Sequence, residues 1–345
     1  MTGRLHFGYW YWENDLVEAM RYFLTTFLFI ISTSMHAGDA ADAFGPWTAF
    51  GKAELEKAVA GKAAMQCNSS MKFSRGLSAQ AVYLVVAPLD VTSRALLDSD
   101  PTRHPELETY QHHRFQSASD AAFEKLALDP RVKAVRHLLD AMPKHEDLQF
   151  SHDEVAKLPK TGARAEAESF WAGVLRDRWS RAASRGDLGG ADHYDARSEI
   201  TTLLAEESGI AQHFGALLTP LTKGPAPLTS AHYYWDVSSV NNVATCGLGA
   251  VFTKVGEKRS QILDVTFYAS SGYLASVTLY ELVPLTHARK PCTFVWQGCL
   301  VSAPGLAGGF GVKRKIASVL TLNDLERSIR LFQQDAASAA TGNAR

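Results

Sequence analysis

Residues 262–283 read ILDVTFYASSGYLASVTLYELV, and no other part of the chain says as much about its fold. The first eight residues alternate between two faces, with Leu263, Val265 and Phe267 on one and Asp264, Thr266 and Tyr268 on the other. Residues 273–283 alternate in the same way, and the SSG between the two runs is typical of a tight turn. The stretch therefore predicts two antiparallel strands joined by a short connection.

The period of two extends over most of the C-terminal third of the chain. Strands are predicted at 232–237, 243–255, 262–269, 273–283 and 292–302, with short connections marked by Gly or Pro, which favours an antiparallel β-meander. Gly247 and Gly249 lie inside the second of these strands and indicate a bulge or tight packing. A terminal helix is expected at 324–336, followed by a disordered tail at 337–345.

The part upstream of the meander has a different character. Residues 38–218 predict a mixed, mostly helical region, with a buried strand at 81–87, a short helix after it and the clearest helix at 165–184. Residues 219–230 (TPLTKGPAPLTS) contain three prolines and a glycine, and we expect a connection there because proline disrupts helix interiors and central strands. Residues 231–336 then hold the antiparallel sheet and the terminal helix. This order of elements predicts an α+β protein.

The segment VYLVVAPLDV at 82–91, followed by Leu96, Leu97 and Asp98, resembles the opening of helix-grip domains, the START-like and polyketide-cyclase-like proteins. In that superfamily a strand ends in a proline just before a short helix. The meander and the terminal helix also follow the family's order of elements. The resemblance implies a curved sheet wrapped round a long helix, enclosing an apolar cavity that binds lipids or other hydrophobic molecules. The chain departs from the family in the roughly hundred helical residues that replace short connections.

Aromatic and polar side chains on the predicted strands form a candidate ligand site. Tyr and Trp present an apolar ring with a polar tip, so rows of them on a sheet can line an amphipathic pocket. The residues we select are Tyr234, Asp264, Tyr268, Tyr280 and Trp296. The alternative is that these side chains are core residues and cross-strand pairs.

A second candidate is the polar run RHPELETYQHHR at 103–114. If this segment is extended, four possible metal ligands project to one side: His104, Glu106, Glu108 and His112. The alternative is a solvated loop that leads into an edge strand. Motifs for a serine hydrolase, a phosphate-binding loop or a zinc protease are lacking, and we expect no cofactor.

Composition narrows the partners. The 35 Lys and Arg balance the 36 Asp and Glu, which argues against a nucleic-acid partner. Four cysteines are too few for a disulfide-built scaffold. One bridge, between Cys246 and either Cys292 or Cys299, is expected if the chain is oxidised, and the alternative is four free thiols, including Cys67.

The start of the chain predicts export. Residues 20–37 (MRYFLTTFLFIISTSMHA) have a basic start, an apolar run and a small residue at the end, which is the pattern of a cleaved signal peptide. The apolar run is shorter than the roughly 20 residues that a bilayer crossing needs. We therefore expect no stable membrane span after cleavage, and a secreted or periplasmic protein. Residues 1–19 are acidic and aromatic, and we interpret them as a spurious extension before a true start at Met20. The alternative is a membrane anchor with a cytoplasmic tail.

Together these patterns favour an exported soluble protein that binds an apolar or amphipathic small molecule on its C-terminal sheet, without catalysis. Two alternatives stay open: a hydrolase or metal-dependent enzyme that uses the cluster at 104–113, and an envelope structural or protein-interaction module.

The export hypothesis makes a direct prediction. When the gene is expressed with its own start, the protein recovered from the exported fraction should have an intact mass that begins at Gly38. A mass that retains residues 20–37, in a protein that sediments with membranes, would instead support the anchor.

Overall fold

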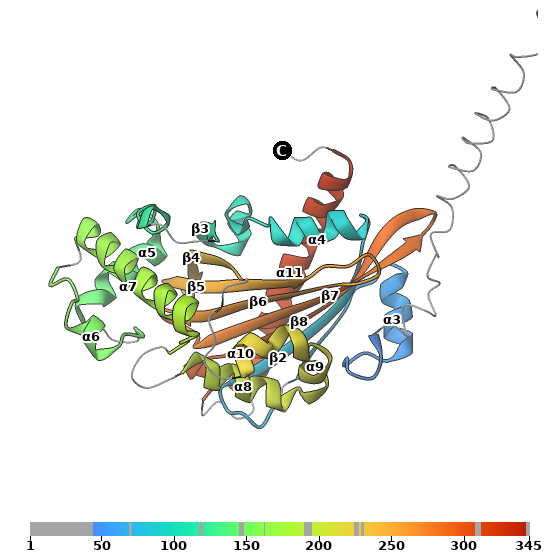
Figure 1. Ribbon diagram of the computed structural model, residues 1–345, viewed down its shortest axis with the longest axis horizontal. Coiled ribbons are helices and arrows are strands. Elements are labelled where there is room, and N and C mark those ends of the chain that lie inside the picture. Colours follow the sequence, from blue (N-terminus) through green and yellow to red (C-terminus); the bar gives the residue numbers. More distant parts are fainter. Residues whose placement is uncertain are drawn as a thin grey trace, which may run out of the picture.

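An eight-stranded antiparallel sheet lies at the centre of the chain, in the order β1-β2-β8-β7-β6-β5-β4-β3 (Figure 1). The computed structural model describes residues 44–68, 71–116, 120–144, 148–161, 163–189, 195–223, 228, 231–307 and 312–342. The predicted extension at 1–19 and signal peptide at 20–37 lie outside these residues. The α+β class expected from the sequence agrees with this arrangement.

The last five strands form the predicted meander. They are β4 (His232–Val240), β5 (Val243–Lys254), β6 (Ser260–Ala269), β7 (Ala275–His287) and β8 (Lys290–Ser302), each paired with the next. The remaining strands are β1 (Ala64–Asn68), β2 (Gly76–Val85) and β3 (Thr109–Phe115). The region from 38 to 218 therefore contributes three strands to the sheet of the C-terminal region.

Strand β2 connects the two regions. It extends the strand expected at 81–87 back to Gly76, and all ten of its residues are buried. It pairs with β8 along its whole length, from Gly76 opposite Ser302 to Val85 opposite Thr293. A strand buried on both faces must be covered on both faces, because its apolar side chains alternate between them.

Helices provide this cover. They are α3 (Lys52–Val59), α4 (Leu89–Leu97), α5 (Lys133–Ala141), α6 (His152–Val155), α7 (Arg164–Arg185), α8 (Ala196–Glu206), α9 (Ser208–His213), α10 (Gly215–Thr222) and α11 (Val312–Ala340). Figure 1 shows α4 and α11 together on one side of the sheet, α8 to α10 grouped on the other, and α5 to α7 at its left end.

Two separate apolar clusters follow from this layering. The larger one lies under α3 and α5 to α10 and includes Trp171, Trp235 and Trp296. The smaller one lies under α4 and α11 and includes Tyr83 and Ile329. We call the side of the sheet that carries the smaller cluster the α4/α11 face.

Hydrogen bonds hold α4 against the end of β8. The hydroxyl of Thr92 donates to that of Thr293 at 2.9 Å, and both hydroxyls reach the carbonyl of Ala87, just after β2. The helix begins at Leu89 with Pro88 at its N-cap position, so a short helix follows the proline that ends the strand, as expected. This contact fixes α4 over the α4/α11 face.

Two helix boundaries differ from the predictions. Helix α10 includes Pro220, so the predicted connection at 219–230 begins only after Thr222. Arg197 donates to the carbonyls of Pro220 and Leu221, which satisfies acceptors at the end of this helix. Helix α11 is longer than the predicted 324–336 and continues into the expected disordered tail as far as Ala340, because alanine is the strongest helix former.

A β-bulge in β6 shows that Tyr268 does not lie on the same face as Asp264, although the alternation predicted that it would. The register between β5 and β6 shifts at Leu248 and Gly249, so that Leu248 opposes Tyr268 while Gly249 opposes Thr266. Phe267 is the extra residue, and beyond it the alternation reverses. Tyr268 therefore joins Leu263 in the larger cluster instead of sharing a face with Asp264. The tight packing expected at the glycines of β5 is confirmed.

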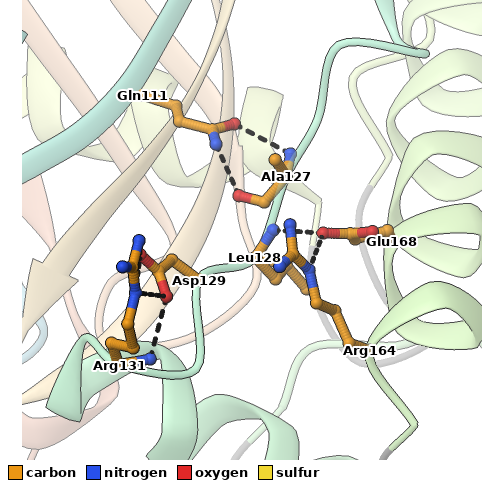
Figure 2. Close-up of polar contacts among 7 residues, drawn as sticks. All are labelled: Gln111, Ala127, Leu128, Asp129, Arg131, Arg164 and Glu168. Atoms are coloured by element: carbon orange, nitrogen blue, oxygen red, sulfur yellow. Dashed lines mark hydrogen bonds and ion pairs between the residues drawn. The ribbon is translucent and has the colours of Figure 1, made fainter.

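Strand β3 forms an edge of the sheet, and its odd-numbered residues anchor it to the helical layer. Figure 2 shows the amide of Gln111 bonded to both the N–H and the carbonyl of Ala127, and the next residue, Leu128, donating to Glu168 of α7. Because neighbouring residues of a strand point to opposite faces, this anchorage turns the side chains of His112 and Arg114 toward the α4/α11 face.

Cys246, Cys292 and Cys299 are free thiols, so the predicted bridge between Cys246 and either of the other two is wrong. Cys246 lies on β5, whereas Cys292 and Cys299 lie on β8, and β6 and β7 separate the two strands. Three strand spacings amount to about 14 Å, and a disulfide requires Cα atoms within about 7 Å.

Packing above β5 supplies a stability prediction. A Cβ atom on Gly249 would lie 2.3 Å from the ring of Tyr234, so Gly249→Ala must displace that ring. We expect a loss of about 1–3 kcal/mol in the free energy of unfolding, measured by urea denaturation. The matched control is Gly173→Ala in α7, where a new Cβ meets nothing within 4 Å and should stabilise the helix by up to about 1 kcal/mol. Equal effects of the two substitutions would contradict the packing described.

Candidate functional site

Polar side chains cross the α4/α11 face from β3 to β2 in a row that we call the polar belt. Its members are His112, Arg114, Tyr234, Asp236, Asp264, Thr266, Thr278, Tyr280, Gln297 and Tyr83. The register aligns them: Arg114 opposes Tyr234, Tyr234 opposes Gly249, and Gly249 opposes Thr266. A polar row beneath covering helices is costly unless its groups find partners.

Tyr234 forms the centre of the belt. Its hydroxyl donates to Asp264 Oδ1 at 2.7 Å and lies 3.0 Å from the hydroxyl of Thr266. The side chain is only 6% exposed, and its ring occupies the space that a side chain on Gly249 would fill. Burial, and the nearby charges of Asp264 and Asp236, raise the pKa of Tyr234 well above its ordinary value, so the phenol stays protonated and able to donate.

Asp236 opposes Gly247 of β5, and its carboxyl fills the space left by the missing side chain of that glycine. Its Oδ1 is the atom that a Cβ on Gly247 would strike, at 2.3 Å. Oδ1 is buried without a hydrogen-bond partner among the described residues, although the backbone N–H of Gly247 lies close enough to the carboxyl to oppose the rise of its pKa. Burial, together with the charge of Asp264, raises the pKa of Asp236 to about 7, so near neutral pH the carboxyl exchanges between its acid and its anion.

His112 opposes Asp236 on the neighbouring strand. Its Nε2 accepts a hydrogen bond from Arg114 Nε at 3.1 Å, which places the proton of a neutral ring on Nδ1. Burial, with the nearby cation of Arg114, lowers the pKa of His112 to about 4, so the ring is neutral near pH 7. Nδ1 is buried and, within the described part of the chain, also lacks a partner.

The far end of the belt is more fully bonded. Tyr83 of β2 donates to Gln297 Oε1 at 3.1 Å, and Gln297 Nε2 reaches the hydroxyl of Tyr280 at 3.5 Å. Burial raises the pKa values of both tyrosines, so these groups act as neutral hydrogen-bonding groups.

A recess of about 620 Å³ opens onto the belt beside β3 and β4. Arg114 and Tyr234 belong to both the recess and the belt, while Leu97 of α4 and Val251 of β5 supply apolar walls. This volume is in the range of small-molecule sites. A smaller cavity of about 100 Å³, lined by Tyr280, Gln297 and Phe332, lies between α11 and the other end of the belt.

Another recess, of about 670 Å³, lies along α7 between Lys157 and Asp177. It is shallow and includes exposed charged side chains of α7, such as Arg176. It lies away from the belt and contains none of the buried unpartnered atoms. The recess beside β3 and β4 is therefore the better candidate site.

The predicted ligand residues divide between the two faces. Tyr234, Asp264 and Tyr280 lie on the belt. Tyr268 and Trp296 lie in the larger cluster, on the opposite face, so their assignment to the same pocket is wrong. The bulge in β6 explains Tyr268. For Trp296, the register pairs it with Glu281, which puts Gln297 on the face of Tyr280.

The predicted metal ligands are not brought together. The segment that holds them is not extended: it forms two 3₁₀ turns, Pro101–Arg103 and Pro105–Leu107, before β3 begins. His104 pairs with Asp335 of α11 at 2.8 Å, while Glu106 and Glu108 are exposed. Among the described residues, no three His, Cys, Asp or Glu side chains form a metal-binding group. The alternative, a loop that leads into an edge strand, is what the structure has, and His112 belongs to the belt.

Sequence reasoning alone misses Asp236, Arg114 and Gln297. Asp236 follows Tyr234 at a spacing of two, and a carboxylate inside the aromatic run YYWDV is a signal that could have found it. Arg114 and Gln297 carry no comparable signal, because only the strand pairing brings them to the belt.

Comparison of the chain with protein-family models, with curated protein sequences and with solved structures finds no match in any of the three. In the described part of the chain, no helix has both the length and the apolar character that crossing a bilayer demands.

The shifted pKa values of Asp236 and His112 predict opposite dependences of stability on pH. The pKa of Asp236 rises from 3.8 to about 7 on folding, so its contribution is present at low pH and is lost as pH rises through 7. The pKa of His112 falls from 6.5 to about 4, so its contribution is present above 6.5 and is lost as pH falls through 4.

In the wild-type protein these two slopes oppose each other between about pH 4 and 6.5. Relative to wild type, Asp236→Asn should become more stable as pH rises across this interval, and His112→Gln should become less stable. Urea denaturation at pH 4.5, 5.5 and 6.5 measures the difference. Parallel curves for the three proteins would contradict a raised pKa for Asp236 and a lowered pKa for His112.

Proposed function

We propose that this protein binds an amphipathic small molecule between the α4/α11 face of the sheet and the elements that cover it. The observation that carries the proposal is the pair of buried, unpartnered polar atoms in the belt, near a recess that shares Arg114 and Tyr234 with the belt and is lined in part by apolar residues. Native proteins rarely leave buried polar atoms without partners, and sites that do so are commonly completed by a ligand or by water.

The arrangement of elements supports a helix-grip type of binding protein. Strand β2, which ends before Pro88, lies beside β8, the last strand of the meander. The 29-residue helix α11 packs on β2 and on α4. These features agree with the resemblance expected from residues 82–98. In such a protein the ligand lies between the sheet and the long helix.

The elements over the belt are tied to one another by polar contacts. His104 bonds to Asp335, and Arg327 donates to the carbonyl of Glu106 at 3.3 Å, which links the turns at 101–107 to α11. Gln333 of α11 donates to the carbonyl of Leu84 at 2.8 Å. These contacts favour a preformed cover over the belt, which lowers the entropic cost of holding a ligand.

We further propose that the protein acts outside the cytoplasm, after cleavage that follows Ala37. This part of the proposal rests on the sequence of residues 20–37 alone.

One observation favours the alternative of a protein-interaction module. Ile316, Val319 and Leu320 on the first half of α11 are each more than half exposed and lie on one stripe of the helix. Nothing in the structure indicates what would cover this stripe, and three side chains make a small patch. Small-molecule binding is therefore the function that the site supports best.

The proposal predicts that a member of a panel of fatty acids, fatty alcohols, sterols and detergents raises the melting temperature. A ligand at 100 times its Kd stabilises the folded protein by about 2.7 kcal/mol. Leu97→Trp should fill the recess and abolish the shift. The matched control, Ser169→Trp, places the same ring in the recess along α7 and should leave the shift unchanged. A panel without any binding species would refute the proposal, as would equal effects of the two tryptophans.

A further inference from the structure

The chemistry of the ligand's polar group can be derived from Asp236 and His112. The two residues oppose each other on β4 and β3, so their Cβ atoms are about 5 Å apart on the same face. Each presents one buried atom without a partner among the described residues: Oδ1 of Asp236 and Nδ1 of His112. A group that serves both atoms must lie above β4, between His112 of β3 and the Oδ1 that Asp236 holds over Gly247 of β5.

The two atoms require different partners. Because Arg114 donates to His112 Nε2, Nδ1 of the neutral ring carries the hydrogen and needs an acceptor. Oδ1 of the Asp236 anion needs a donor, since a carboxylate can only accept. A hydroxyl group is both donor and acceptor, so a single hydroxyl within reach of both atoms would satisfy them.

The charges around these two atoms act against an anionic ligand. Asp236, Asp264 and Asp100 are carboxyl groups of this region; Arg114 faces Asp264, and Arg103 faces Asp100. Asp100 already accepts from the backbone and the hydroxyl of Thr102, and Asp264 accepts from Tyr234. A carboxylate placed between Asp236 and His112 would meet Asp236 as a like charge and offer it no hydrogen.

We propose that the belt recognises the hydroxyl group of a neutral, apolar alcohol, which accepts from His112 Nδ1 and donates to Asp236 Oδ1, and that it discriminates against carboxylates of the same length. The chain of such a ligand extends along the apolar walls of the recess, past Leu97 and Val251. This inference rests on the proposed function and assigns the ligand class.

The test compares decan-1-ol with decanoate, two probes that differ only at the polar end. Binding is measured at pH 8 by calorimetric titration of the full chain. We expect decan-1-ol to bind at least roughly tenfold more tightly than decanoate, since leaving a buried polar group unpaired costs of the order of a tenfold change or more.

Three variants assign the effect to atoms. Asp236→Leu removes the acceptor and should weaken decan-1-ol by roughly tenfold. Asp236→Asn keeps the size of the side chain but removes its charge. It should reduce the difference in affinity between decan-1-ol and decanoate. Thr202→Val, which removes a hydroxyl on α8 on the opposite side of the sheet, is the control and should bind both probes as wild type does. The melting temperature of each variant reports that it is folded.

The outcomes separate this inference from the function on which it rests. If both probes bind equally well, and the Asp236 variants bind as wild type does, amphiphile binding stands and recognition of a hydroxyl is overturned. If neither probe binds, and the wider panel of amphiphiles also fails, the proposed function is refuted and this inference with it.

Discussion

The pairing of β2 with β8 is the constraint from which the layers of this molecule follow. These strands are more than two hundred residues apart in the sequence, yet they pair over ten consecutive positions, and every residue of β2 is buried. Such a strand is stable only when both faces are covered, because apolar side chains alternate between them. The layer of α4 and α11 on one side, and the layer that includes α3 and α8 on the other, meet this requirement.

Covering both faces creates the setting for the polar belt. The α4/α11 face carries fewer apolar side chains than the opposite face, and carboxyl, phenol and imidazole groups occupy its centre. Burial raises the pKa of Asp236 and lowers the pKa of His112, which favours the neutral form of each. The two side chains therefore do not form a stabilising ion pair. Chains that retain such groups commonly do so at functional sites, where stability is given up for recognition.

Much of the fold could be predicted from local pattern. The alternation between 232 and 302, with its short connections, predicts strands β4 to β8, and the apolar run at 81–87 predicts most of β2. Short strands such as β1 lack that contrast, since all five residues of β1 are half-buried. Helix α11 extends past the predicted end because alanine continues a helix that no proline or internal glycine interrupts.

The site was harder to predict from the sequence, because the register between neighbouring strands decides which residues lie on the belt. One extra residue at Phe267 moves Tyr268 to the opposite face, and no local signal marks a bulge within VTFYA. The glycines of β5 are the only hint of it. Pairing across strands likewise decides that Gln297, and not Trp296, lies beside Tyr280. Three of the five predicted ligand residues lie on the belt. The alternation of side chains within one strand can be read from the local sequence, whereas the register between two strands cannot.

A crystal structure of the protein with decan-1-ol bound would decide whether the belt recognises a ligand. We predict that the alcohol oxygen lies within hydrogen-bonding distance of Asp236 Oδ1 and His112 Nδ1, with the alkyl chain against Leu97 and Val251. An alcohol bound elsewhere, such as along α7, with the belt unchanged, would contradict the assignment of the belt as the recognition surface of this protein.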